Sequence, residues 1–137
     1  MKKTLSVLLA LCCVCSLLVF VSCDDSAEAP SELWQNATYT EDVTLGTGDT
    51  TVTILIEAEG KSITVTLKTN KEKLGDAMFE VGLVEDASFF STLNGMEAKW
   101  NPDQAWWAYY QGDTMMNYGV NDTVIENNAQ YRFVYTK

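Results

Sequence analysis

Two runs of alternating side chains, separated by a tight turn, place the strongest constraint on the fold of this chain. Apolar residues recur at every second position in residues 50–58 and again in residues 61–68, and Gly60 lies between the two runs. A period of two puts the apolar side chains on one face of a strand, and a glycine between two such strands marks a turn. The runs therefore predict a β-hairpin with one apolar face, which another part of the chain must cover.

A single amphipathic helix is predicted directly after the hairpin. Its apolar stripe has the i, i+3, i+4, i+7 spacing of one helical face and consists of Leu74, Ala77, Met78 and Val81. Residues 69–72, Thr-Asn-Lys-Glu, match a capping box, and Gly82 suits the left-handed residue that ends many helices. We expect a helix of about three turns that packs on the hairpin, because so short a helix is not stable alone.

More strands are predicted in the second half of the chain. Asn94-Gly95 is typical of a type I′ hairpin turn, and residues 105–111 and 131–136 each predict a strand, with a short return at Met115-Met116 between them. This order predicts an α+β, β-grasp-like domain over residues 50–137, in which one helix packs across a mixed, mostly antiparallel sheet. Residues 23–49 are predicted to be an acidic tether, part of which, residues 34–48, would dock on the domain as an added edge strand.

The first 22 residues have the features of a bacterial lipoprotein signal peptide. Lys2 and Lys3 precede an apolar run from residue 5 to residue 21, and Ser22 stands before Cys23. Cleavage there would leave Cys23 as the lipid-bearing N-terminus and would anchor the protein at the cell surface, outside the cytoplasm. A cleaved ordinary signal and an uncleaved anchor are the alternatives, the latter because an apolar run of roughly 17 residues is at the lower limit for a membrane span.

The composition argues against several kinds of catalytic site. The chain has no histidine, and its four cysteines are Cys12, Cys13, Cys15 and Cys23. A chain cut before Cys23 therefore lacks both the commonest general base and any thiol beyond the lipidation site. Acidic residues at positions 80, 85 and 86 lack the spacing of a calcium loop and are predicted to be solvated. We expect no enzymatic activity, no metal site and no cofactor.

The charge of the chain bears on its partners. Removal of the leader takes away two of the nine basic residues and none of the 19 acidic ones, so the formal net charge falls from −10 to −12. Such an excess repels nucleic acid and anionic headgroups, which leaves lipid on Cys23 as the expected link to the membrane. The excess either serves solubility alone or attracts a cationic ligand.

An ordered set of motifs resembles a known bacterial family. The motifs are STLNG at residues 91–95, WWAYYQG at 106–112, YGVND at 118–122 and FVY at 133–135. Their order is similar to that of the transcobalamin-like C-terminal domain, over roughly residues 50–135. The resemblance implies a β-grasp fold and ligand binding, since in the vitamin carriers of this family the domain closes over cobalamin held against a helical barrel. No such barrel is present in this sequence.

Candidate ligand-binding residues lie on the strand at 105–111 and in the return after it. Alternation places Trp107 and Tyr109 on one face, which the resemblance identifies as the core face, and Trp106 and Tyr110 on the other. Two aromatic side chains there would bind a planar or sugar-like ligand, unless the segment around Trp34 covers them. The resemblance also places residues 111–118 near the ligand. The candidates are therefore Trp106, Tyr110, Gln111, Met115, Met116 and Tyr118.

Together these patterns predict a surface-tethered, non-enzymatic lipoprotein that binds a small molecule. The resemblance implies a corrinoid such as cobalamin as the ligand. The alternative is a structural or adhesive module of the cell envelope, which would contact a protein or an envelope polymer through the same aromatic residues.

Overall fold

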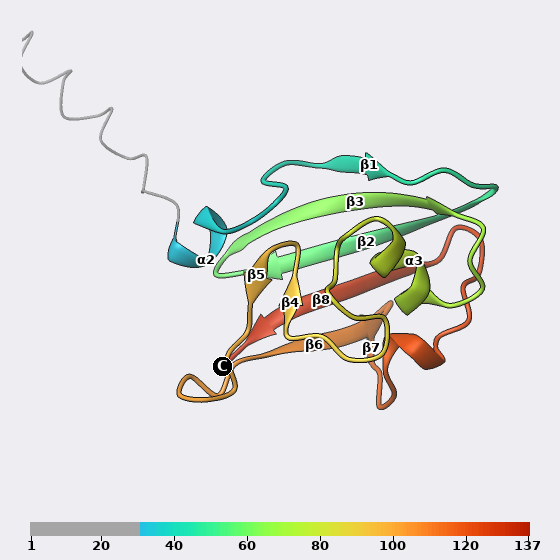
Figure 1. Ribbon diagram of the computed structural model, residues 1–137. Helices are drawn as coiled ribbons and strands as arrows, with labels where there is room; N and C mark the ends of the chain where they lie inside the picture. The colour runs from blue at the N-terminus through green and yellow to red at the C-terminus, as the bar shows by residue number, and fades with distance from the viewer. Residues whose placement is uncertain (1–30) are drawn as a thin grey trace, which may run out of the picture. The chain divides into compact units, whose positions relative to one another are not determined.

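A six-stranded mixed sheet is the framework of the structure, a computed structural model that describes residues 31–137 (Figure 1). The predicted leader and Cys23 lie outside the described residues. The strand order is β1-β3-β2-β8-β6-β7, and β4 (Thr92–Leu93) pairs with β5 (Met96–Glu97) in a separate two-stranded ribbon. The protein is therefore a mixed α/β structure that is mostly sheet, with few helices.

The predicted hairpin is confirmed. Strands β2 (Thr50–Ala58) and β3 (Lys61–Thr69) pair antiparallel along their whole length. Glu59 and Gly60 form the turn, and both have positive φ. The alternating apolar residues of both strands are fully or almost fully buried on one face of the sheet, as their period of two requires.

Two long-range pairings complete the sheet. The last strand, β8 (Gln130–Thr136), runs parallel to β2 and antiparallel to β6 (Trp106–Gln111), which in turn pairs with β7 (Thr114–Met115). At the opposite edge, β1 (Val43–Leu45) runs parallel to β3. The compact unit therefore begins at Ser31 and includes the segment around Trp34.

The helix after the hairpin starts later than predicted, and its predicted capping box is wrong. Helix α3 spans Leu74–Glu80, and its N-cap residue, Lys73, makes no capping hydrogen bond from its side chain. Thr69 is instead the last residue of β3, and its buried hydroxyl accepts a hydrogen bond from the Lys71 amide at 3.0 Å. The strand thus continues through the residue that a helix would use as a cap. Gly82 does have the predicted left-handed conformation. Its φ is 75°, close to the 78° of Gly60 in the hairpin turn.

The N-terminal segment is held by one buried tryptophan. Helix α2 (Glu32–Gln35) carries Trp34, which is 3% exposed and donates a hydrogen bond from Nε1 to the Ala58 carbonyl at 2.9 Å. The Lys61 ammonium lies 4.8 Å from the centre of the same ring. Further along, the buried Asn94 side chain bonds both the amide and the carbonyl of Tyr39 at 2.9 Å. These contacts join the segment to the β2–β3 turn and to the β4–β5 ribbon.

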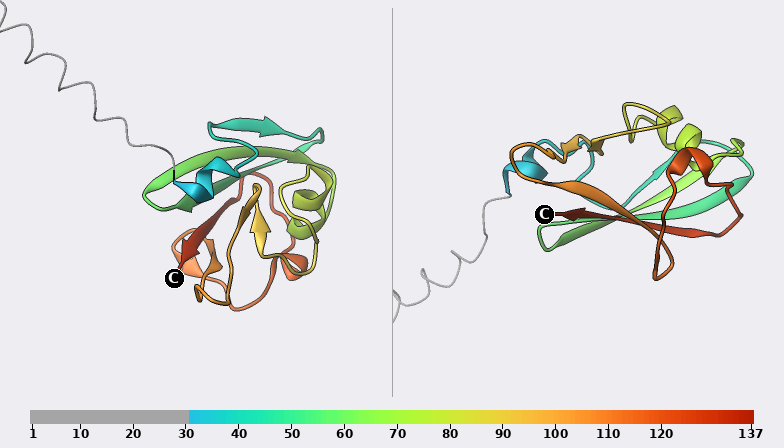
Figure 2. Two further views of the ribbon diagram at one scale, coloured as in Figure 1. Left: turned by 60° about the vertical axis from the view of Figure 1, so that its left-hand side comes forward. Right: turned by 90° about the horizontal axis from the view of Figure 1, so that it is seen from below.

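The helices lie on one side of the sheet. Figure 2 shows α2, α3, the β4–β5 ribbon and the 3-10 helix η2 (Val120–Asp122) on the same side of the strands. Side chains on that side form the core, whereas the outward residues of β2 and β3 are exposed or half-buried. None of the helices described in residues 31–137 is long and apolar enough to cross a bilayer.

We expect Trp34→Ala to lower the free energy of unfolding by about 3 kcal/mol, because it removes a buried aromatic side chain and leaves the Ala58 carbonyl without its donor. Urea unfolding of the chain from residue 24 onward measures the change. Glu32→Ala, at an exposed position two residues before Trp34, is the control and should alter the value by less than about 0.5 kcal/mol. Equal stability of the two variants would show that the N-terminal segment is not part of the folded unit.

Candidate functional site

An aromatic groove lies between the loop at residues 88–90 and the loop at residues 116–120. Its volume is about 340 Å³. Buried residues of the sheet and η2 form its floor, among them Tyr109, Phe133 and Val120, and the exposed side chains of Phe89 and Tyr118 stand at its rim. None of the residues that line the groove carries a charge. In a chain of net charge −10 this is a distinct apolar surface.

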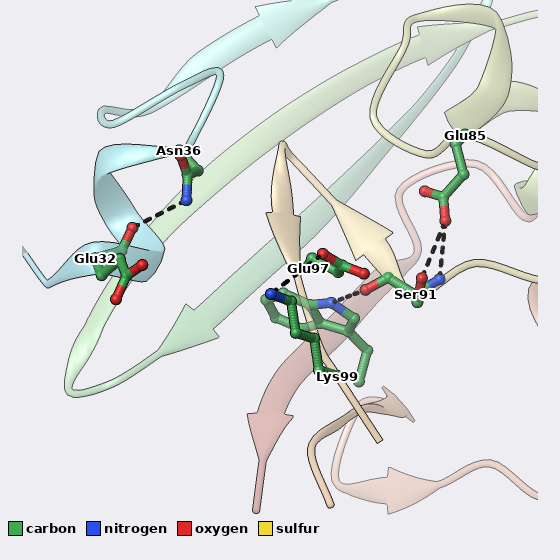
Figure 3. A network of polar contacts seen from close by, with 7 residues as sticks. Glu32, Asn36, Glu85, Ser91, Glu97 and Lys99 are labelled. Carbon is green, nitrogen blue, oxygen red and sulfur yellow. Dashed lines mark hydrogen bonds and ion pairs between the residues drawn. The ribbon is translucent and has the colours of Figure 1, made fainter. Parts of the chain in front are cut away.

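Two carboxylates shape the loop on one side of the aromatic groove. The Asp86 carboxylate accepts hydrogen bonds from the amides of Ser88 and Phe89, at 2.6 and 3.2 Å. The Glu85 carboxylate accepts from the Ser91 amide at 3.0 Å and the Ser91 hydroxyl at 3.4 Å (Figure 3), and also from the Thr92 amide. Both acidic residues are exposed, as the sequence predicts, but they also fix the backbone that presents Phe89.

This loop is also bound to the sheet. Trp107 donates a hydrogen bond from Nε1 to the Ser91 carbonyl at 3.1 Å. The Phe90 ring meets the Phe133 ring edge-on at 5.9 Å, and the Tyr109 ring stacks on Phe133 at 5.0 Å with an interplanar angle of 12°. Phe90 therefore packs inward while Phe89, its neighbour, is 80% exposed.

A chain of hydroxyl groups holds the opposite wall. The Thr123 hydroxyl donates to the Gly119 carbonyl at 3.2 Å, so the Tyr109 hydroxyl is the donor in its 2.9 Å contact with Thr123. The Met116 amide also bonds the Tyr109 carbonyl at 2.8 Å. Burial raises the pKa of Tyr109 to about 12. Tyr109 therefore stays a neutral donor at physiological pH.

A second groove, of about 580 Å³, shares a wall with the aromatic groove. Phe89, Phe90, Trp106 and Trp107 line both grooves. The far wall of the second groove contains Trp100, which is 66% exposed. Its only charged residues, Glu97 and Lys99, lie 4.0 Å apart and pair with each other (Figure 3).

The structure brings three of the six predicted ligand-binding residues together. Trp106, Met116 and Tyr118 line the aromatic groove. Tyr110 and Gln111 do not line it, and Met115 lies on β7, exposed and outside both grooves. The Arg132 guanidinium lies over the Tyr110 ring at 4.4 Å on the other face of the sheet. Trp34 covers neither Trp106 nor Tyr110, since it is bound at Ala58.

Sequence reasoning missed Phe89, Phe90 and Trp100. All three belong to irregular segments, in which neither a period of two nor a helical period assigns a face. A signal was nevertheless present at residues 85–91. Two acidic residues followed by small residues and two phenylalanines are typical of a loop whose carboxylates bind backbone amides.

Within residues 31–137, no group of three or more acidic, histidine or cysteine side chains is arranged to hold a metal ion.

Comparison with solved structures shows which proteins share this fold. A "putative metal binding protein" from Ruminococcus gnavus superposes with a TM-score of 0.60 at 17% sequence identity, over 65% of this chain and 98% of that one. Haptocorrin in complex with Cbi superposes with a TM-score of 0.52 at 15% identity, over 64% of this chain and 25% of haptocorrin. The likeness is one of fold, and this chain matches a quarter of haptocorrin. No protein-family model and no curated protein matches the sequence.

The loop at residues 86–89 should open in acid. Hydrogen bonds from the amides of Ser88 and Phe89 lower the pKa of Asp86 below its ordinary value of 3.8. The ionised form therefore favours the closed loop above pH 3.8, and this contribution is lost as the pH falls through the lowered pKa. We expect amide hydrogen exchange at Ser88 and Phe89, corrected for its intrinsic pH dependence, to accelerate over that range. Asp86→Asn should abolish the pH dependence, and a wild-type loop insensitive to acid would contradict the assignment.

Tyr109→Phe should lower stability at neutral pH by about 1 kcal/mol through the lost hydrogen bond to Thr123. Because folding raises the pKa of Tyr109 from 10.0 to about 12, its contribution is complete below pH 10 and is lost as the pH rises toward 12. The variant should therefore lose less stability than the wild type between pH 10 and 12, as measured by urea unfolding. If the free energy of unfolding fell equally with pH in the wild type and in Tyr109→Phe, Tyr109 would not be the group whose pKa folding raises.

Proposed function

We propose that this protein is a non-enzymatic module that binds a small, largely apolar ligand in the aromatic groove. The observation that carries the proposal is an uncharged groove with aromatic walls on an otherwise strongly acidic chain. Binding sites for small molecules are concave, mostly apolar and largely preformed. The hydrogen bonds of Glu85, Asp86 and Tyr109 preform both walls here.

The ligand we propose is planar, with a corrinoid as the first candidate. Aromatic rings at the rim of a groove offer flat faces at little cost in conformational entropy. Support for a corrinoid comes from the motif order described above and from the likeness in fold to haptocorrin, of the cobalamin-binding transcobalamin family. This chain corresponds to a quarter of haptocorrin, so we propose that the groove receives one edge of such a macrocycle.

We further propose a β-grasp-like fold and a surface location. The strand order supports the fold, because the hairpin β2–β3 is followed by α3 and the last strand runs parallel to β2 in the middle of the sheet. The basic and apolar leader followed by Cys23 supports a lipid anchor outside the cytoplasm. The absence of histidine from the whole sequence supports binding without catalysis, and we propose no cofactor and no nucleic-acid partner.

One observation favours a second candidate, the structural or adhesive envelope module. Phe89 and Trp100 are 80% and 66% exposed, and large exposed aromatic side chains mark contact surfaces for other macromolecules. In this case a protein or an envelope polymer would cover Phe89, on the wall that the two grooves share, and Trp100, on the far wall of the second groove.

Isothermal titration calorimetry of residues 24–137 with cobinamide and hydroxocobalamin tests the proposal. We expect saturable binding that Phe89→Ala and Tyr118→Ala each weaken by about tenfold, since each removes about 1.4 kcal/mol of contact. Phe79→Ala is the matched control, because Phe79 is 55% exposed on α3 and lines neither groove.

Equal losses in Phe79→Ala and Phe89→Ala would remove the aromatic groove as the site. No saturable heat at about 1 mM corrinoid would overturn the corrinoid as ligand. It would favour the envelope partner if Phe89 and Trp100 still mediate capture of such a partner.

A further inference from the structure

The face of the sheet opposite the helices is rich in hydroxyl groups. On three neighbouring strands the register places Thr44, Thr66 and Thr53 in one row across the sheet. Adjacent strands lie about 4.8 Å apart, so the row is a regular ladder of short polar side chains. In residues 31–137 no helix packs on this face, as Figure 2 shows.

The chain has a single arginine, and it lies in the middle of this face. Arg132 is on β8, opposite Leu55 of β2 and Tyr110 of β6. Its guanidinium lies 4.4 Å from the centre of the Tyr110 ring and 3.5 Å from the Glu57 carboxylate. A guanidinium held over a ring and by an ion pair is ordered before any ligand arrives.

A cavity of about 450 Å³ lies beside this arginine. Polar side chains line much of it, namely Thr53, Thr64, Asp113, Gln130 and Arg132, and Leu55 lies among them. The volume is within the range of about 300–1,000 Å³ that is usual for small-molecule sites. None of these residues lines either groove on the other face. The cavity is therefore a separate surface with separate chemistry.

One donor at this cavity is unused. The Nε atom of Arg132 is inaccessible to solvent and has no hydrogen-bond partner within the described part of the chain. Buried polar groups are normally paired, so this N–H is a donor for which the described residues supply no acceptor, and a ligand oxygen would reach it only by displacing the side chains that cover it.

We propose that this face binds a neutral saccharide through the cavity at Arg132. Each sugar hydroxyl both donates and accepts, which matches the threonine hydroxyls, the Gln130 amide, the Asp113 carboxylate and the Arg132 guanidinium. Glu57 balances the charge of Arg132 and Asp113 adds a carboxylate to the lining, so the cavity offers an anion no excess positive charge. The acidic chain as a whole also repels anions. A neutral, hydroxyl-rich ligand satisfies all of these conditions.

The test is calorimetric titration of residues 24–137 with neutral tetrasaccharides of glucose, mannose and N-acetylglucosamine, and with tetragalacturonate as the acidic arm. We expect at least one neutral saccharide to bind, and Arg132→Lys to weaken binding by at least about tenfold, because lysine keeps the charge but lacks the planar donors. Thr64→Val should also weaken binding. Thr51→Val is the matched control for Thr64→Val. Thr51, on β2, faces the same side of the sheet as Thr64, on β3, but does not line the cavity.

Failure of this proposal is distinguishable from failure of the aromatic groove. Phe89→Ala should leave saccharide affinity unchanged, and Arg132→Lys should leave binding in the aromatic groove unchanged. No saturable binding of any neutral saccharide at about 10 mM would overturn the proposal. A preference for tetragalacturonate, or equal affinity of the wild type and Arg132→Lys for every sugar, would overturn it as well.

Discussion

The parallel pairing of β8 with β2 is the contact on which the other features depend. It inserts the last strand of the chain between the first hairpin and β6, so that one sheet unites residues more than half the sequence apart. Alternation along β8 then separates two kinds of chemistry. Phe133 points into the core, where it supports Tyr109 and Phe90 under the aromatic groove, and Arg132 points to the open face. One strand thus supplies Phe133 to the aromatic groove and Arg132 to the cavity on the open face.

The acidic excess of the chain is used in part as a structural resource. Exposed carboxylates bind backbone amides at three places: Asp42 at the Thr64 amide, Glu85 at the Ser91 amide and Asp86 at the Ser88 amide. Such bonds tie irregular segments to the backbone within them or beside them, and they keep the negative charges in water. The same arrangement leaves the lining of the aromatic groove uncharged. The charge and the apolar site are therefore compatible features of one surface.

Local patterns predict the parts of the fold that depend on near neighbours. The hairpin around Gly60 and the Asn94-Gly95 turn follow from side-chain period and backbone freedom, and the structure has both. Alternation separates the two faces of the strand at 106–111, but the family resemblance identified the face of Trp107 and Tyr109 as the core face, and both residues are buried. The start of α3 was predicted wrongly, because a sequence match to a capping box does not reveal that Thr69 still belongs to a strand. Two features depend on tertiary contacts, and no side-chain period in the sequence predicts them. They are the parallel pairing of β8 with β2 and the directions in which Phe89 and Phe90 point. Half of the predicted site residues therefore lie outside the aromatic groove.

The docking of Trp34 against Ala58 limits where the protein can act. With the compact unit beginning at Ser31, only the seven residues 24–30 separate it from Cys23. Fully extended, the eight steps of the chain from Cys23 to Ser31 span at most about 28 Å. If Cys23 carries the predicted lipid, the domain is confined to a thin shell above the headgroups, and lateral diffusion in the plane of the bilayer governs its encounters with other anchored molecules. A ligand released within that shell meets a high local concentration of binding surface, whereas one held beyond it, in an outer polymer layer, is out of reach.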